Sequence, residues 1–301
     1  MKSALLFLCT LLVVMTSSAC DHEKVRTDPI EDRVVKKDEF YLYNISEQQL
    51  GVYNKENMKW MPLHKEDNLF QYMFNNDSEY VVSGHSIDNQ FVLLKLSEDR
   101  KNINKVFELS NDKDCFFPLA SDGEKFYYVL YEDEKNTEVI KRSIFTLDEN
   151  NHVELVKRTD DLITSGLIID QLLYYTVFDP DKEKYSVYSI DLNQKENEPE
   201  LVKTNLEARE LYRIGNELYF SSRDKIFNNK ESFEKKSENF FVGNLMIQIY
   251  TDPINGLICT VTNVVNKKVM HTFENPINFE VNDNVLTLYC EGHIYKISTA
   301  D

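Results

Sequence analysis

A unit of four short apolar segments recurs along this sequence, and that recurrence constrains the fold more than any other feature. In each segment apolar and polar residues alternate with a period of two, and clusters of Asp, Asn, Lys and Gly separate the segments, which is typical of β-strands joined by turns. The unit is clearest in residues 116–158, and the same order of segments recurs in residues 69–110 and 163–204. The sequence therefore predicts three successive units of four antiparallel strands.

Tyrosines in the second segment of each unit give the period of the repeat. Tyr80, Tyr127 and Tyr174 are 47 residues apart, and Tyr219 follows 45 residues later. Repeats of about 40 to 50 residues with four strands are typical of β-propeller blades. One such sheet cannot bury both of its faces, whereas sheets packed around an axis cover one another. We predict an all-β chain that forms a β-propeller of six or seven four-stranded blades over residues 39–301, with seven favoured and a β-sandwich as the alternative.

The repeat is less regular at both ends and in one internal stretch. Residues 39–63 and 277–298 each predict three strands, so we expect the terminal segments to share or adjoin the closing blade, which would remove an open edge. Residues 223–241 interrupt the fifth unit, where Ile226 and Phe233 are seven residues apart. This spacing fits one face of a short helix, and an irregular loop whose phenylalanines pack on the neighbouring blade fits equally. If an insertion binds a partner, this stretch is the candidate.

Residues 1–19 have the layout of a secretory signal peptide: a basic start, an apolar stretch over residues 4–15, and small residues before a cysteine. The apolar stretch has about 12 residues, whereas a membrane-spanning helix needs about 20. Ser17, Ala19 and Cys20 resemble the lipobox of bacterial lipoproteins, although that family has an aliphatic residue where this chain has Ser17. The resemblance implies cleavage before Cys20, lipidation of its thiol, and attachment to the cell membrane on the extracytoplasmic side. The alternative is a secreted protein whose first structural cysteine lies here.

Residues 20–38 contain mostly charged side chains and little to bury, so we expect them to form a tether between the lipidated cysteine and the folded part. The chain carries 51 acidic residues against 34 Lys and Arg, a formal net charge of −17. A surface this acidic repels polyphosphate, so nucleic acid is not expected as a partner. Contact with the membrane is expected through the lipid anchor alone, because anionic lipid repels such a surface too.

Five cysteines are present, and two of them, Cys9 and Cys20, belong to the leader and to the lipidation site. Cys115, Cys259 and Cys290 remain in the folded part. An odd number of thiols cannot pair completely within one chain, and three cysteines do not make a disulfide framework. Two outcomes stay open: a bridge between Cys259 and Cys290, or three buried thiols on strands.

No motif predicts catalysis, a metal site or a cofactor site. The six histidines lack metal-binding spacing, no CxxC or GxSxG sequence occurs, and the eight glycines form no nucleotide-binding loop. Residues 179–183 group three acidic side chains, but a solvated hairpin tip explains this run better than a calcium loop does. We therefore predict no catalytic, cofactor-binding or metal-binding residues.

In layout, residues 39–300 resemble bacterial extracytoplasmic propellers that have paired tyrosines in the second strand and Asp-Gly turns, many of them of unknown function. The resemblance implies no particular activity. With the lipid anchor, it favours a binding or scaffolding module for a protein, peptide or glycan. Aromatic residues near strand ends are the expected partner contacts: Trp60, Tyr72, Phe117, Tyr212 and Phe233. The alternative is a glycoside hydrolase or lyase of the cell envelope, which needs only two suitably spaced carboxylates.

Overall fold

The computed structural model describes residues 35–298 apart from short internal gaps. The leader and Cys20 therefore lie outside the described residues, as does most of the tether. Within the described residues the regular structure is entirely β-strand, with no helix. The gaps are at residues 64–68, 76–77, 86–89, 98, 110–114, 134–139, 149, 151, 160, 195–197, 208 and 283–284.

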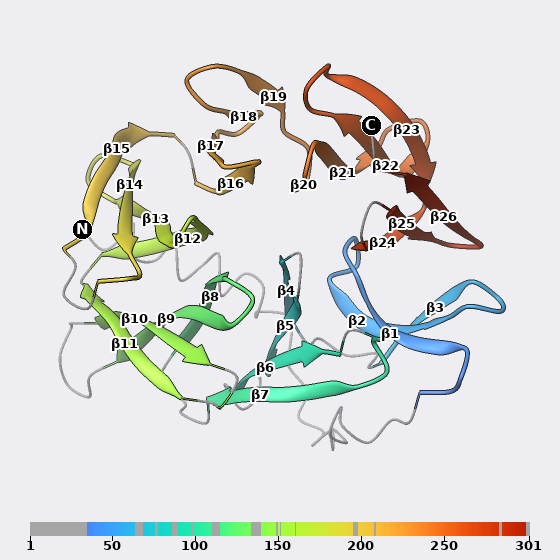
Figure 1. The fold of residues 1–301 in the computed structure, drawn as a ribbon, viewed down its shortest axis with the longest axis horizontal. Coiled ribbons are helices and arrows are strands. Elements are labelled where there is room, and N and C mark those ends of the chain that lie inside the picture. Colours follow the sequence, from blue (N-terminus) through green and yellow to red (C-terminus); the bar gives the residue numbers. More distant parts are fainter. Residues whose placement is uncertain are drawn as a thin grey trace, which may run out of the picture.

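The described strands form seven antiparallel sheets, and each sheet consists of strands that follow one another in the chain. Figure 1 shows them arranged as a ring. Sheet 1 contains β1 (Glu39–Asn44), β2 (Gln49–Asn54) and β3 (Lys59–Pro62). Sheet 2 contains β4 (Leu69–Asn75), β5 (Ser78–His85), β6 (Gln90–Leu96) and β7 (Ile103–Leu109). Sheet 3 contains β8 (Cys115–Ser121), β9 (Lys125–Asp133), β10 (Ile140–Asp148) and β11 (Val153–Thr159).

The remaining four sheets continue the ring in chain order. Sheet 4 contains β12 (Leu162–Ile169), β13 (Leu172–Asp179), β14 (Lys184–Asp191) and β15 (Glu200–Leu206). Sheet 5 contains β16 (Leu211–Ile214), β17 (Glu217–Ser221), β18 (Lys225–Phe227) and β19 (Ser232–Glu234). Sheet 6 contains β20 (Glu238–Val242), β21 (Leu245–Asp252), β22 (Gly256–Asn263) and β23 (Lys268–Glu274). Sheet 7 contains β24 (Pro276–Asn282), β25 (Val285–Cys290) and β26 (His293–Ser298).

Sheet 4 shows why the period-two pattern produces this arrangement. Asp170 and Gln171 both adopt positive φ and connect β12 to β13 in a two-residue turn, which sets the register of the hairpin. Alternate residues of β13 then face opposite neighbours: Leu173 packs in a core with sheet 3, while Tyr174 packs with sheet 5. The first strands of sheets 2 to 6 contact one another in succession, so they form the inner side of the ring.

Sheets 1 and 7, formed by the two ends of the described chain, lie side by side without exchanging strands. β1 contacts β24, and the rings of Phe40, Tyr53 and Tyr289 pack together with centroids 5.3–5.5 Å apart. The Ile45 backbone N–H donates to the Ile277 carbonyl at 3.0 Å. The terminal segments thus adjoin at the closure, which is one of the two arrangements predicted. The two facing layers of a β-sandwich are not observed, so that alternative is wrong.

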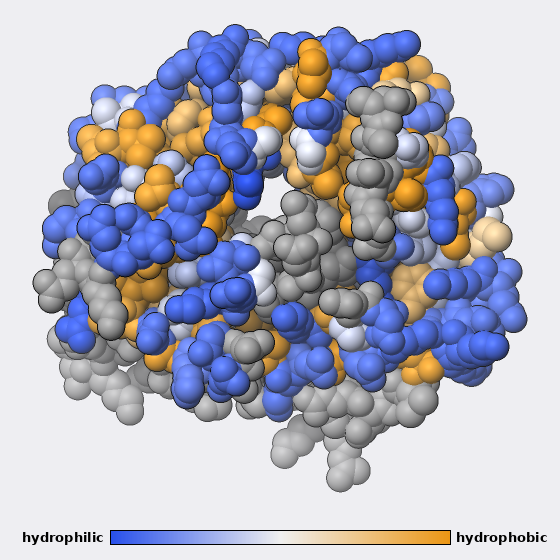
Figure 2. Space-filling model, viewed as in Figure 1, coloured by the Kyte–Doolittle hydropathy of each residue, from blue (hydrophilic) through white to orange (hydrophobic). Residues whose placement is uncertain are grey.

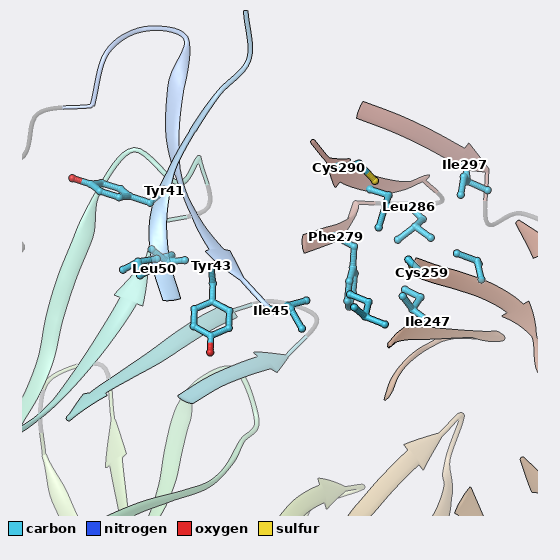
Figure 3. Close-up of a cluster of buried hydrophobic side chains, with 14 of the residues drawn as sticks. Tyr41, Tyr43, Ile45, Leu50, Ile247, Cys259, Phe279, Leu286, Cys290 and Ile297 are labelled. Carbon is cyan, nitrogen blue, oxygen red and sulfur yellow. The ribbon is translucent and has the colours of Figure 1, made fainter. Parts of the chain in front are cut away.

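The largest apolar core joins sheets on both sides of this closure. Tyr41, Tyr43 and Leu50 come from sheet 1, and Phe279 and Leu286 come from sheet 7. Figure 3 shows these two groups extending from strands on opposite sides of the close-up. Cys259 and Cys290 lie in the same core as buried, unpaired thiols, so the bridge between them is not formed. The third cysteine, Cys115, lies in β8, and its side chain is outside the described part.

The backbone of residues 223–241 forms neither a helix nor an irregular loop. Both predictions of its backbone structure are therefore wrong. The stretch supplies β18 and β19, which complete sheet 5, and β20, which begins sheet 6. Ile226 and Phe233 are nonetheless buried, at 0% and 6% exposed, in a core shared with Met246 of sheet 6. The packing of a phenylalanine on the neighbouring sheet is therefore confirmed.

Candidate functional site

A group of partly buried charged side chains lies where β16 and β20 begin. These are the first strands of sheets 5 and 6, they contact each other, and Figure 1 shows both at the inner edge of the ring. Figure 2 shows an opening near the middle of the same view, bordered on its left side by hydrophilic residues. We call the group the inner-strand cluster; its members are Glu210, Tyr212, Ser221, Lys235 and Glu238.

Glu210 is the hydrogen-bonding centre of the inner-strand cluster. Its backbone pairs with Ser221, because the Ser221 N–H donates to the Glu210 carbonyl at 3.0 Å and the Glu210 N–H donates to the Ser221 hydroxyl at 3.2 Å. Its Oε2 lies 2.7 Å from Lys235 Nζ and accepts a hydrogen bond of 2.8 Å from the Tyr212 hydroxyl. Oε1 takes part in neither contact. One side of the carboxylate is thus held while the other keeps its capacity to accept hydrogen bonds.

The pKa values of the two carboxylates in the cluster are shifted in opposite directions. Burial acts to raise the pKa of Glu210, but the hydrogen bond and charge of Lys235 outweigh it, so the pKa lies below its ordinary value. Burial raises the pKa of Glu238, and the nearby charge of Glu210 raises it further. No hydrogen bond to the Glu238 carboxylate is found among the described residues. Glu210 is therefore the charged member, and Glu238 is the one that holds a proton more readily.

Neighbouring side chains fix the position of β20 at this point. Gln248 of β21, which is 5% exposed, donates from Nε2 to Asn239 Oδ1 and to the Glu234 carbonyl, both at 2.8 Å. Asn239 in turn donates to the Lys236 carbonyl at 2.8 Å. These buried amides tie the segment between β19 and β20 to sheet 6. This segment carries Lys235, and Glu238 follows it as the first residue of β20. The cluster therefore rests on a rigid support.

Tyrosines surround the two carboxylates. The pKa of Tyr212 is raised by burial and by the charge of Glu210, so its hydroxyl remains a hydrogen-bond donor to that carboxylate. The pKa of Tyr43, from β1 in sheet 1, is likewise raised by burial and by the charge of Glu238. Glu238 is thus close enough to act on a residue of sheet 1 as well as on Glu210 of sheet 5.

A hollow of about 320 Å³ lies between sheets 4 and 5, apart from the inner-strand cluster. Its walls are Tyr174, Val202, Leu218 and Phe220, and the ion pair of Glu217 with Lys230 lies at its rim. This site is apolar where the inner-strand cluster is charged. It can accept an apolar group but offers few polar atoms for chemistry.

The five aromatic residues expected to contact a partner do not gather in one place. Trp60 belongs to sheet 1 and its Nε1 donates to the Leu42 carbonyl at 2.9 Å. Phe117 is half-buried against the core between sheets 3 and 4, and Phe233 is 6% exposed in the core between sheets 5 and 6. Only Tyr212 belongs to the inner-strand cluster. Tyr72 lies in β4, and its side chain is outside the described residues.

Trp60 also has a structural role that its sequence context does not reveal. Its indole lies directly over Gly51 of the neighbouring strand, where a Cβ atom would come within 2.4 Å of the ring. Only glycine leaves room for this approach. The partner contacts proposed from the sequence stay predictions, but the structure gives Trp60 and Phe233 packing roles.

Other features of the sequence have structural explanations. Asp179 accepts hydrogen bonds from the backbone of Asp181 and Lys182 and pairs with Lys182 Nζ at 2.7 Å, as expected for a hairpin tip. Across the described segments, no group of three or more His, Cys, Asp or Glu side chains is placed to hold a metal ion. No helix long and apolar enough to cross a membrane is found in the described part of the chain.

Comparisons with known proteins identify the fold. No protein family model and no curated protein matches the sequence. Similar solved structures include an oligogalacturonate lyase in complex with manganese, with a TM-score of 0.52, 12% identity, and coverage of 88% of this chain and 92% of that chain. The uncharacterized protein lmo1340 from Listeria monocytogenes EGD-e has a TM-score of 0.51, 15% identity, and coverage of 91% and 98%.

Puromycin hydrolase has a TM-score of 0.53 and 6% identity over 87% of this chain, which corresponds to 51% of that chain. The fold is a β-propeller. At these identities the likeness concerns the fold alone, because unrelated functions occur on the same scaffold.

Proposed function

We propose that this chain is a lipoprotein held on the outer side of the cell membrane through Cys20, and that its propeller is a binding module for a protein, peptide or glycan. We assign one blade to each of the seven sheets, which makes the propeller seven-bladed. The inner-strand cluster is the proposed binding site. The observation that carries this proposal is Glu238, a half-buried carboxylate with no described hydrogen bond, beside the fixed Glu210–Lys235 pair.

The chemistry of the cluster defines the ligand. Carboxylate oxygens accept hydrogen bonds, so they suit hydroxyl groups of a sugar or an ammonium group of a peptide. Lys235 Nζ supplies a cation 2.7 Å from Glu210, and this pairing keeps the site from being a purely acidic patch. Few, well-positioned polar groups on a rigid support are what gives a binding site its specificity.

The binding proposal is tested with Glu238→Gln, which keeps the shape of the side chain and removes its charge. We expect weaker binding of envelope oligosaccharides or of lysine-containing tripeptides, by about tenfold for a charge-assisted hydrogen bond. Isothermal titration calorimetry with the full-length protein measures this loss. Glu234→Gln is the matched control, because Glu234 is an exposed glutamate of the preceding strand. Equal binding by all three proteins contradicts the proposed site.

The anchor is tested separately from the binding site. We expect mass spectrometry of the mature protein to find an acylated N-terminal Cys20, and we expect Cys20→Ala to leave the protein in the soluble fraction. A mature chain that begins elsewhere, or one whose Cys20 carries no acyl group, contradicts the lipoprotein assignment. The outcome does not depend on whether the inner-strand cluster binds a ligand.

A second candidate function is glycoside cleavage by hydrolysis or elimination. It is favoured by the opposite pKa shifts of Glu210 and Glu238, since a carboxylate and a protonated carboxyl in one site are the usual base and acid of such reactions. The similar solved structures include an oligogalacturonate lyase, which adds a likeness of fold only. Incubation with oligogalacturonate, followed by assays for unsaturated products and for reducing ends, tests this candidate. Cleavage that is lost in both Glu210→Gln and Glu238→Gln supports it, and no cleavage by the wild type contradicts it.

A further inference from the structure

Sheet 7 ends one strand earlier than the five sheets before it. Sheets 2 to 6 each have four strands, whereas sheet 7 has three and its last strand is β26. In the described residues, β26 pairs with β25 on one side and with no strand on the other. Half of the N–H and C=O groups of an edge strand point away from its partner, so such an edge can accept another strand.

Sheet 1 also has three strands, but its edge is a poor acceptor. β3 has only four residues and ends at Pro62, which has no N–H to donate. β26 has six residues and contains no proline. The outer edge of sheet 7 is therefore the better place for an added strand.

A row of rings, exposed except for the half-buried Phe273, lies beside this edge, on the outer rim of the interface between sheets 6 and 7. The ring centroids of His271 and Phe273, both on β23, are 5.8 Å apart. Phe273 lies 4.6 Å from Tyr295 of β26, and Tyr295 lies 5.8 Å from His293. Figure 1 shows β23 and β26 next to each other at the outside of the ring.

The register explains why these four rings share one face at the rim of the core. Phe273 is paired with Cys259, and Tyr295 is paired with Leu288, and both partners are fully buried between the two sheets. The rings thus continue that core outward. Among the described strands, sheet 7 has no fourth strand to cover this rim, and Tyr295 is 36% exposed.

We propose that the outer edge of β26 binds an extended peptide of a partner protein as the fourth strand of sheet 7. Alternate residues of the peptide face sheet 6 and are apolar, so that they pack on Tyr295 and the adjoining rings. On the opposite face of the added strand, the peptide residue that lies beside Lys296 is acidic. Backbone hydrogen bonds supply affinity, and these two side-chain preferences supply specificity.

The charges around the edge favour this occupant over a second copy of the chain. Lys296 is exposed on β26, and Lys268 is exposed at the start of β23. Two copies of a chain with a formal charge of −17 repel each other, whereas a mostly neutral peptide with one acid opposite Lys296 gains the local attraction without that cost. The surface is distinct from the inner-strand cluster and extends the proposed binding role to a second site.

The test uses synthetic peptides of six residues, the length of β26. One peptide alternates valine with threonine and has a single glutamate, the second has lysine in place of the glutamate, and the third has a central proline. Fluorescence anisotropy with the full-length protein measures their binding. We expect the glutamate peptide to bind about 3- to 10-fold more tightly than the lysine peptide, the size of a favourable cross-strand charge pair. We expect the proline peptide to lose binding because it cannot complete the backbone ladder.

Variants of exposed residues locate the site without threatening the fold. In Lys296→Glu the preference of the two charged peptides is expected to reverse. Lys225→Glu, at an exposed lysine of β18 in sheet 5, is the matched control and keeps the original preference. His271→Ala is expected to weaken both peptides about threefold through lost contact with the apolar face, while Leu201→Ala on the exposed outer strand β15 has no effect.

Three outcomes overturn the proposal. The first is equal binding of the glutamate, lysine and proline peptides, which means that no strand is added. The second is peptide binding that appears only after deletion of residues 21–34, which means that the chain's own N-terminal segment occupies the edge. The third is a dimer in sedimentation analysis that Lys296→Glu dissociates, which makes a second copy the occupant. Glu238→Gln leaves binding of the glutamate peptide unchanged, because that peptide carries no lysine for the inner-strand cluster, so failure here is distinguishable from failure there.

Discussion

Sheets 4 and 5 come from equivalent stretches of the repeat, yet they differ in strand length and in how well they are packed. The strands of sheet 4 have seven or eight residues, and those of sheet 5 have three to five. Leu173 and Leu218 occupy the same place, the second residue after the tight turn, but Leu173 is 0% exposed while Leu218 is half-buried at the hollow between the sheets. Shorter strands cover less of a neighbouring sheet.

The difference places stability and the candidate site in different parts of the ring. Sheet 4 uses neutral hydroxyls at its inner end, where Thr164 and Thr176 are 2.8 Å apart. Sheet 5 has the Glu210–Lys235 pair at the equivalent end, close to the Glu238 carboxylate. A sheet that contributes less apolar packing is the one that carries the charged groups, as is common where a fold accommodates a functional site.

The largest expected effect on stability comes from replacing the two leucines, Leu173 and Leu218. We expect Leu173→Ala to lower the free energy of unfolding by about 3 kcal/mol, because it leaves a cavity in a closed core. We expect Leu218→Ala to cost only about 1 kcal/mol, since its side chain already borders a hollow. Urea unfolding measures both values. Equal losses would show that the hollow does not loosen the packing of sheet 5.

The next test removes the cation of the inner-strand cluster. Because Glu210 is 41% exposed, solvent screening limits the loss in Lys235→Met to about 1 kcal/mol at neutral pH. The pKa of Glu210 is lowered in the folded protein, so the pair stabilises the fold above the ordinary glutamate pKa and loses its effect as pH falls through the lowered value. Thermal unfolding should therefore separate wild type and variant at neutral pH and bring them together in acid. A gap that persists in strong acid argues against the ion pair.

Glu238→Gln is expected to raise the stability of the fold, whereas Lys235→Met lowers it. The pKa of Glu238 is raised in the folded state, so the fold loses stability as pH rises from the ordinary glutamate pKa through that raised value. The variant is expected to be more stable than wild type by less than about 1 kcal/mol at neutral pH. The difference should vanish below the ordinary glutamate pKa, where both states are protonated. A destabilised variant at neutral pH would mean that the carboxylate is paired in the folded protein.

The smallest effect is expected at the surface of sheet 4. Lys184 Nζ and Glu207 Oε1 are 3.0 Å apart, but their side chains are 37% and 76% exposed. Lys184→Ala should change the free energy of unfolding by no more than about 0.5 kcal/mol. Lys235→Met is measured in the same buffer for comparison. If Lys184→Ala lowers the free energy of unfolding as much, solvent exposure does not determine how much each ion pair stabilises the fold.

The sequence predicted the strands well where a turn and an alternating pattern agreed. Asp122-Gly123 is one such place: Gly123 has a φ of 98°, and Asp122 accepts hydrogen bonds from the backbone of Glu124 and Lys125. All four tyrosines used to measure the period, from Tyr80 to Tyr219, lie in second strands. Such local signals are sufficient because each sheet is built from consecutive strands.

The same local reasoning failed around residues 223–241. Strands of three residues are too short to show alternation, so the seven-residue spacing of Ile226 and Phe233 indicated a helix where β18 and β19 form. Glu210 and Glu238 were missed because their proximity depends on the contact between β16 and β20, which no sequence pattern encodes. One signal was available: an acidic residue stands at the start of three successive inner strands, where Asp161 and Glu210 directly precede β12 and β16 and Glu238 is the first residue of β20.

The junction between sheets 1 and 7 has a consequence for the order in which the ring forms. Each sheet is a meander of neighbouring strands, so it can assemble from contacts that are close in sequence. The junction joins residues as distant as Tyr53 and Cys290, whose side-chain and backbone oxygens are 3.2 Å apart. Contacts across almost the whole chain are slow to form, so this seam is completed after the individual sheets.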